Sequence, residues 1–221
     1  MDRGGILIFI LFAAVVIVAV ILGSLAARKR RGELARLAAR LGLQFSPDKD
    51  SAFADGWSFL AKLARGSNRY AFNILSGEHE GHRVFVFDYH YRTGSGKNAQ
   101  HHYLTFFILL LPGAFPELTI APEGLLSKLA QALGYADIDF ESAEFSRAFC
   151  VRSKDKRFAY DVCNAQMMEY LLANRDLDLE IEGPALALTQ DRRLSVAEIE
   201  GNLARLLRLR ALLPGYLFDK T

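Results

Sequence analysis

The first 31 residues constrain this chain more than any other segment. Residues 4–27 contain no charged side chain, and the run ends in Arg28, Lys29, Arg30 and Arg31. At about 1.5 Å per residue, a helix over this run would be roughly 36 Å long, and the hydrocarbon core of a bilayer is about 30 Å thick. The segment therefore predicts one membrane-spanning helix with a juxtamembrane basic cluster, followed by a globular domain.

The charges that flank the apolar run predict its orientation. Only Asp2 and Arg3 precede it, whereas four consecutive cations follow it. Because cationic flanks stay on the cytoplasmic side, we expect a single-pass protein of the cell membrane whose domain faces the cytoplasm. Residues 28–31 would then lie at the membrane surface, where they attract anionic headgroups. A cleaved signal peptide is the alternative, because residues 24–26 resemble a cleavage site. The length of the run and the position of its charges favour an uncleaved anchor.

The composition of the remaining chain narrows the classes of partner. Residues 1–31 hold five of the 27 basic and one of the 25 acidic residues, which leaves 22 basic and 24 acidic residues in the domain. A domain this close to neutral offers no electrostatic footprint for nucleic acid, so we predict no nucleic-acid partner. The apolar run predicts the lipid bilayer as a partner. The two cysteines, Cys150 and Cys163, fit buried thiols in a reducing compartment better than a disulfide, and they form no zinc signature.

Helical spacing continues beyond the cations. Leu34, Leu37, Ala38 and Leu41 recur on one face, and Gly42 supplies a stop signal. We therefore expect the helix to extend to about Leu41. We divide the chain into an anchor (1–31), a helical connector (32–68) and an α+β cytoplasmic domain (69–221), and we consider a hinge near residue 121.

The pattern from residue 69 onward predicts an antiparallel β-meander packed by helices. Residues 70–76 and 82–92 flank a turn-rich segment typical of a hairpin, and a third strand is expected over 103–111, ending at Pro112 and Gly113. A helix over 123–133, a strand over 145–152 and a helix over 157–173 should follow. Ser195 and Glu198 form a capping-box motif for a last helix that runs to about residue 212.

Residues 176–190 alternate apolar and polar side chains around Gly183 and Pro184. The alternation predicts a half-exposed hairpin. Its solvated face would carry Asp176, Asp178, Glu180 and Glu182, and the repulsion within this acidic row would suit a basic protein partner.

The candidate chemistry lies on the central hairpin, where all five histidines fall between residues 79 and 102. Symmetric pairing about the loop places residue 88 opposite 105 and residue 90 opposite 103. Asp88, His90 and His101 then share one face with Tyr103 and Thr105, while the apolar side chains take the other. Two imidazoles and a carboxylate can ligate zinc or act as an acid–base pair. The alternative is an ordinary solvent-facing strand surface.

The glycine-rich segment "TGSGK" (93–97) does not make a phosphate-binding P-loop. That motif needs a glycine where Tyr91 stands and a Ser or Thr where Asn98 stands, and it joins a strand to a helix. A flexible hairpin tip explains the segment, and we predict no cofactor.

Three stretches resemble a widespread group of bacterial single-span membrane proteins that is classed as a domain of unknown function. They are "NILSGEHEGHRVFVFDYHYRTGSGK" (73–97), "LTIAPEG" (118–124) and "FESAEFSRAFCVRSKDKRFAYDVCNAQMMEYLL" (140–172). The resemblance implies a membrane-anchored α+β domain that faces the cytoplasm, without implying an activity.

Three functions remain open from the sequence. The leading hypothesis is a membrane-anchored interaction or scaffolding domain without catalytic activity, because no catalytic motif is present. The second is a metal-dependent or acid–base enzyme of the hydrolase class that uses Asp88, His90 and His101. The third is a sensor of anionic lipids or a small ligand, which would read the membrane surface through the cations between Arg28 and Arg40.

Overall fold

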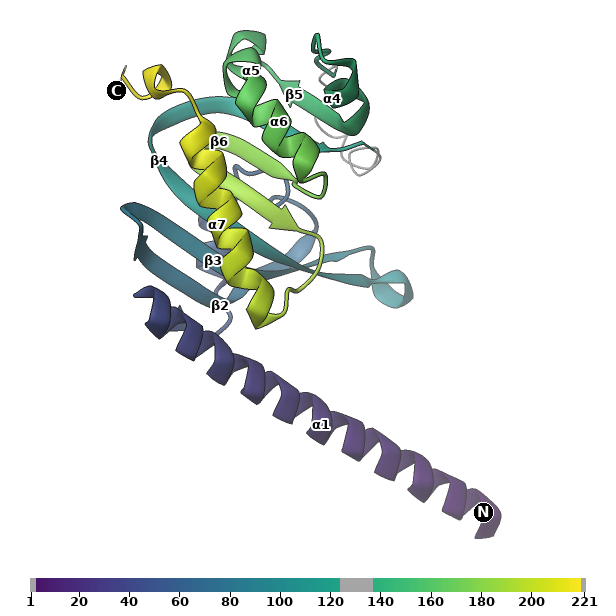
Figure 1. Ribbon diagram of the computed structural model, residues 1–221. Helices are drawn as coiled ribbons and strands as arrows, with labels where there is room; N and C mark the ends of the chain where they lie inside the picture. Colours follow the sequence, from purple (N-terminus) through teal and green to yellow (C-terminus); the bar gives the residue numbers. More distant parts are fainter. Residues whose placement is uncertain (1–2, 124–136, 220–221) are drawn as a thin grey trace.

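A computed structural model describes residues 3–123 and 137–219. The fold is α+β, as predicted: a long N-terminal helix leads into a six-stranded antiparallel sheet that is packed by helices (Figure 1). The helix expected over residues 123–133 falls outside the described residues, apart from its first position.

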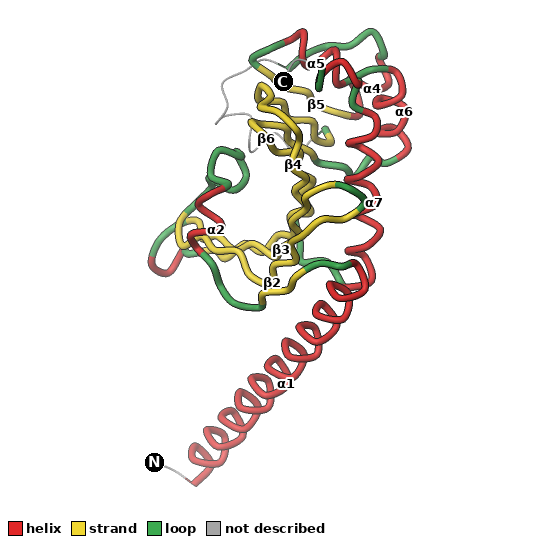
Figure 2. Tube along the Cα trace, turned by 90° about the vertical axis from the view of Figure 1, so that its left-hand side faces the viewer, coloured by secondary structure: helices red, strands yellow, loops and turns green. Residues whose placement is uncertain are grey.

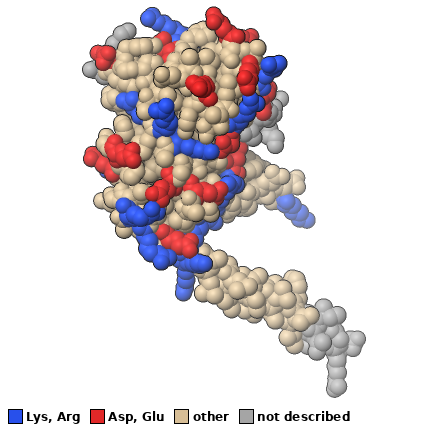
Figure 3. Space-filling view, viewed as in Figure 1, with Lys and Arg blue, Asp and Glu red and all other residues tan. Residues whose placement is uncertain are grey.

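Helix α1 (Arg3–Leu41) is one continuous helix, which confirms the predicted extension to Leu41. It ends where Gly42 adopts a left-handed conformation with φ of +72°. By length and composition, α1 can cross a membrane, with a mean hydropathy of 3.0 in its apolar part. Figure 3 shows that this part leaves the domain as a bare apolar rod, whereas basic and acidic side chains are interspersed over the domain.

The predicted meander is confirmed. Strands β1 (Gln44–Ser46), β2 (Ser67–His79), β3 (His82–Thr93) and β4 (Gln100–Pro122) pair antiparallel in chain order. Asp88 pairs with Thr105 and His90 with Tyr103, which is the predicted register. Helix α2 (Ser51–Gly56) precedes β2, and the 3₁₀ turn η1 (Gly96–Asn98) forms the tip of the β3–β4 hairpin.

Strand β4 does not stop at Pro112 and Gly113, as the sequence predicted, but continues to Pro122. The two residues instead mark a bend, where the pairing with β6 (Leu179–Gln190) shifts register between Leu110 and Phe115. Strand β6 follows the same curve inside β4 (Figure 1) and turns at Gly183, whose φ is +54°. Its two arms come together where the Thr189 N–H donates to the Asp178 carbonyl at 2.9 Å. The predicted half-exposed hairpin of two strands is therefore wrong: β6 is a single, mostly buried strand that bends at Gly183 and pairs with β4 on both sides of the bend.

Two predictions about the C-terminal part were wrong because local caps override the apolar pattern. The expected strand over 145–152 begins instead as helix α4 (Ala143–Ala148), since the Ser142 hydroxyl accepts from the Phe145 N–H, and only β5 (Phe149–Ser153) is extended. The expected helix over 157–173 is two helices, α5 (Lys156–Val162) and α6 (Ala165–Ala173). Asn164 caps α6 through the Met167 N–H and thereby separates the two.

Strand β5 pairs with the last part of β4, so the two halves of the domain around residue 121 share one sheet. Helix α7 (Val196–Leu212) begins at the predicted capping box and ends as predicted, and a short 3₁₀ turn, η3 (Gly215–Leu217), follows it. The described cysteines are both free and buried, as expected. Burial raises the pKa of the Cys163 thiol.

The sheet is covered on both faces (Figure 2). The second half of α1, together with α5, α6 and α7, packs on what we term the helix face, which carries Val84, Val86, Phe107 and Leu109. Helix α2 and the loop 57–66 pack on the opposite, loop face, which carries Phe87, Tyr89, Leu104, Phe106 and Ile108. The predicted apolar face of the hairpin is this loop face. Because both faces are covered, Asp88, His90 and Thr105, which the sequence placed on a solvent-facing surface, are buried instead, whereas His101 and Tyr103 remain exposed.

Candidate functional site: a polar layer beneath the membrane helix

The side chains on the helix face change from apolar to polar along β3. Val84 and Val86 lie in the same core as Leu34 and Leu37 of α1. Two residues further along the strand, the face becomes polar, yet Asp88, His90 and Thr105 are at most 2% exposed. A buried polar side chain costs free energy unless it is hydrogen-bonded. The polar atoms of this layer therefore need hydrogen-bond partners within the protein.

Asp88 is the centre of this layer. The Arg30 guanidinium of α1 donates to both carboxylate oxygens at 3.0 Å, and Arg193 lies 3.4 Å from one of them. The Asn73 side-chain amide donates at 2.8 Å, and the Thr105 hydroxyl lies at 3.3 Å. Two cations and two neutral donors thus compensate one buried carboxylate. Such a contact fixes the part of α1 nearest the membrane to the middle of the sheet.

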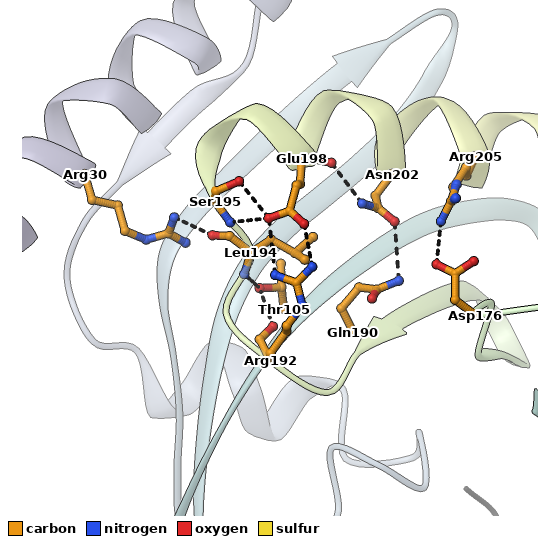
Figure 4. A network of polar contacts seen from close by, with 10 residues as sticks. All are labelled: Arg30, Thr105, Asp176, Gln190, Arg192, Leu194, Ser195, Glu198, Asn202 and Arg205. Carbon is orange, nitrogen blue, oxygen red and sulfur yellow. Dashed lines mark hydrogen bonds and ion pairs between the residues drawn. The ribbon is translucent and has the colours of Figure 1, made fainter. Parts of the chain in front are cut away.

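A second set of contacts holds Arg30 from the other side (Figure 4). Its other terminal nitrogen donates to the Leu194 carbonyl at 2.6 Å, just before α7. The Leu194 N–H donates in turn to the Thr105 hydroxyl at 3.1 Å. Helix α1, strand β4 and the β6–α7 connection are therefore joined through one arginine and one threonine.

The same figure shows how α7 is tied to the segments that flank β6. The Glu198 carboxylate accepts from the Ser195 N–H at 2.8 Å and pairs with Arg192. Further along α7, Arg205 donates to Asp176 at 2.7 Å. These contacts are exposed, so they define the orientation of α7 more than they add stability.

The histidines form a pair next to Asp88. His90 Nε2 lies 2.8 Å from His101 Nδ1, and His90 Nδ1 lies 3.0 Å from the Asn68 carbonyl. Because a carbonyl only accepts, Nδ1 of His90 carries a proton, and a neutral His90 then accepts at Nε2 from His101. Burial lowers the pKa of His90, and the neighbouring His101 adds to the effect.

The structure thus separates the three residues that the sequence grouped as a candidate site. It joins His90 to His101, and it directs Asp88 to arginines. Among the described residues, three metal-ligating side chains converge within 4.8 Å at Glu123, Asp137 and Cys150. Asp137 there accepts from the N–H groups of Ile138 and Val151, which gives it a structural role. Burial raises the pKa of the Cys150 thiol to about 11.

Arg30 is the residue whose role the sequence reasoning missed. Arg28, Lys29 and Arg31 are exposed, whereas the Arg30 side chain is only 18% exposed. The sequence does indicate this role through helical spacing. Arg30 precedes Leu34 by four residues and Leu37 by seven, which places it on the packed face of the helix. Three cations of the cluster are therefore exposed, and the fourth belongs to the domain.

The loop face has a buried ionic cluster of its own, which overturns the prediction of a solvated acidic row. Asp178 and Glu180 are 6% and 3% exposed. Lys62, itself buried, pairs with Asp178, and the Ala61 N–H donates to Glu180. Burial raises the pKa of Glu180 to about 7 and also raises that of Asp178. Asp178 and Glu180 face inward because the loop 57–66 covers that face of β6. Asp176, at 57% exposure, and the half-buried Glu182 stay in contact with solvent.

Comparison with known proteins extends the description of the fold. No family model and no curated protein matches the sequence. The structure is similar to the crystal structure of the mycobacterial trehalose monomycolate transport factor A, TtfA. The TM-score is 0.58 at 14% sequence identity, and the similarity covers 85% of this chain and 96% of TtfA. At this identity the comparison shows a shared fold that extends over almost the whole of both chains.

Proposed function

We propose that the protein is a membrane-anchored accessory domain that acts by binding other components at the cytoplasmic face of the membrane. The observation that carries the proposal is the rigid junction between α1 and the sheet. Residues 34, 37 and 38 are core residues, and Arg30 is bound to the buried Asp88. A helix attached in this way fixes which side of the domain faces the membrane and which side faces a partner.

The structural neighbour is consistent with such a role. TtfA is named a transport factor. The orientation rests on the cations at residues 28–31, which follow the apolar run. The absence of a recognisable catalytic motif in the sequence favours binding over catalysis.

The test compares three forms of the protein in native membranes, each with a photo-crosslinker at the exposed Tyr216. The first is the full chain, the second carries an unrelated apolar span in place of residues 4–27, and the third begins at residue 28. We expect the first two to give the same crosslinked product and the third to lose it, together with its membrane location. If the third form keeps both, anchoring is not needed for binding and the proposal fails.

The cytoplasmic orientation has its own test. C-terminal fusions to one reporter active only in the cytoplasm and to another active only outside it should give activity with the first. Activity outside the membrane would overturn the assignment based on residues 28–31. It would also direct the search for partners to the cell envelope.

One observation favours a second candidate, a metal-dependent or acid–base enzyme. Two imidazoles in direct contact, His90 and His101, form a unit that can share a proton or bind a transition metal such as zinc. Adding zinc to the full chain in detergent should then raise its melting temperature, and His101→Ala should abolish the rise. An unchanged melting temperature in both proteins would exclude the metal-dependent form of this candidate.

A further inference from the structure

The β3–β4 hairpin and the apolar part of α1 leave the domain in the same direction. At one end of their contact, the Leu41 carbonyl of α1 lies 3.3 Å from His79, which pairs with His82 at the start of β3. At the other end, Arg30 binds Asp88. From Leu41 back to Arg30, α1 therefore follows β3 from residue 82 to residue 88. In Figure 1 the hairpin and the N-terminal part of α1 both project from the lower right of the domain.

The hairpin continues further in this direction than the polar part of α1. Strand β3 extends five residues beyond Asp88, which is about 17 Å at 3.3 Å per residue. From Arg30 to Ala27, where the apolar run begins, α1 covers only about 4.5 Å. Even with α1 inclined away from the sheet, the tip of the hairpin comes to the level at which α1 enters the bilayer.

The charge of the hairpin suits that location. No acidic residue occurs between Tyr89 and Pro116, whereas Arg92 and Lys97 are present. Lys97 lies in η1 at the tip and is exposed, like its neighbour Asn98. Together with the exposed Arg28, Lys29 and Arg31 of α1, the tip presents only positive charge to the membrane surface.

An aromatic patch lies between these two sources of charge, on the helix face of the hairpin. Tyr103 is 42% exposed, although it is aromatic, and its ring lies 4.9 Å from His90 and 6.4 Å from Phe72. Arg193 lies over Phe72 at 5.2 Å. Exposed tyrosines next to cations are typical of the interface between membrane and water, where the ring reaches the acyl boundary and the hydroxyl stays in the headgroups.

We propose that the β3–β4 hairpin, residues 90–103, lies on the headgroups of the leaflet that α1 enters and that it binds anionic lipids through Lys97 and the adjoining aromatic patch. The contact would give the domain a second point of attachment and so restrict its rotation about α1. The inference rests on the membrane anchoring contained in the proposed function, but not on the choice of leaflet.

The experiment measures the depth of the hairpin in full-length protein reconstituted into nanodiscs. An environment-sensitive fluorophore is placed at Asn98→Cys, and at Lys156→Cys on α5 as an exposed control far from α1 (Figure 1). Phosphatidylcholine with a nitroxide on its headgroup serves as the quencher. The unsubstituted chain, whose two cysteines are buried, gives the labelling blank. We expect quenching roughly threefold stronger at residue 98 than at residue 156 in discs that contain phosphatidylglycerol, because only the hairpin contacts headgroups.

Charge variants test whether the hairpin binds anionic lipids through Lys97. Lys97→Glu in the Asn98→Cys protein should bring its quenching close to that at residue 156, because the tip then repels the surface. Lys156→Glu in the same protein is the matched control and should change nothing. Raising the salt concentration or omitting phosphatidylglycerol should weaken the quenching at residue 98.

Two outcomes would overturn the inference. Equal quenching at residues 98 and 156 would mean that the hairpin stands in water, free for a protein partner. Strong quenching that is independent of Lys97 and of phosphatidylglycerol would exclude recognition of anionic lipids. A fluorophore at Val16→Cys on α1 separates these failures from failure of the anchor, since quenching by mid-chain nitroxide lipid at this position reports insertion of α1 itself.

Discussion

Asp88 on the helix face and Glu180 on the loop face are almost equally inaccessible to water, at 2% and 3% exposure, yet they are compensated differently. Asp88 accepts from one nitrogen of Arg30 through both of its oxygens, and it also receives a second arginine and two neutral donors. Glu180 accepts from one backbone N–H, and the nearby Lys62 pairs with Asp178. The fully compensated carboxylate lies where the membrane helix joins the domain, and the poorly compensated one holds a loop. Burial by itself therefore does not determine how a carboxylate affects the stability of the fold. The number of hydrogen-bond donors and cations around the carboxylate determines it.

The largest effect is expected from removing Arg30. Arg30→Ala leaves Asp88 buried with only the half-exposed Arg193 as a cation, and it should lower the free energy of unfolding by about 3 kcal/mol. Denaturant unfolding of the full chain in detergent, followed through Trp57 on the loop face, measures the loss. Arg31→Ala is the matched control, since Arg31 is exposed, and it should have no effect. Equal losses in the two variants would show that Asp88 does not need Arg30.

Two truncated forms of the chain, one with Arg30 and one without it, should differ in stability for the same reason. A protein that begins at residue 28 keeps Arg30, whereas one that begins at residue 32 loses it. We expect the second to unfold at a lower denaturant concentration, by the same amount of free energy as Arg30→Ala. If the two truncated forms are equally stable, the buried ion pair adds nothing to the junction.

The next effect depends on pH and concerns the loop face. The pKa of Glu180 is about 7 in the folded protein and 4.5 in its ordinary environment, so between these values only the folded state holds the proton. The contribution of Glu180 to the free energy of unfolding therefore falls as the pH rises from 4.5 to 7 and is constant above that window. Glu180→Gln should be more stable than the parent chain at pH 8 by up to about 3 kcal/mol, and the difference should vanish below pH 4.5. A difference that does not change with pH would contradict the assignment to Glu180.

A smaller effect is expected from the neutral part of the Asp88 network. Thr105→Val keeps the shape of the side chain but removes the hydroxyl that accepts from the Leu194 N–H. The buried N–H then has no partner, which should cost about 1 to 2 kcal/mol. Thermal unfolding of the two proteins measures the loss, and Thr105→Ser, which retains the hydroxyl, should recover most of it.

The smallest effect is expected where α1 makes an exposed ion pair. Arg40 and Glu200 are 2.9 Å apart, but their side chains are 61% and 50% exposed. Arg40→Ala should lower the free energy of unfolding by less than about 0.5 kcal/mol, because water solvates both charges. A loss as large as that of Arg30→Ala would mean that position along α1, rather than burial, determines the strength of these pairs.

The predictions that succeeded from the sequence rest on local patterns. The apolar run, the spacing of Leu34 to Leu41, the β2–β3–β4 meander with its register and the capping box at Ser195 all appear in the structure as expected. Each depends on residues close in the chain, where periodicity and turn chemistry decide. The two wrong element boundaries near residues 145 and 163 also have local causes, namely the caps at Ser142 and Asn164. Those side chains were visible in the sequence.

What the sequence determined by itself is an apolar helix able to cross a membrane and an antiparallel meander with one apolar face. Only the tertiary structure decided what covers the other face. Helices α1 and α7, which come from distant parts of the chain, cover that face and bury strand positions that look solvated in the sequence. On the apolar face, the loop 57–66 does the same for Asp178 and Glu180. A buried charge is strongly destabilising unless it is paired with an opposite charge. Asp88 and Arg30, which look like two surface charges in the sequence, are therefore paired in the structure, and their ion pair joins the apolar helix to the domain. Periodicity shows which residues share a face, but the packing of distant segments decides whether that face meets water.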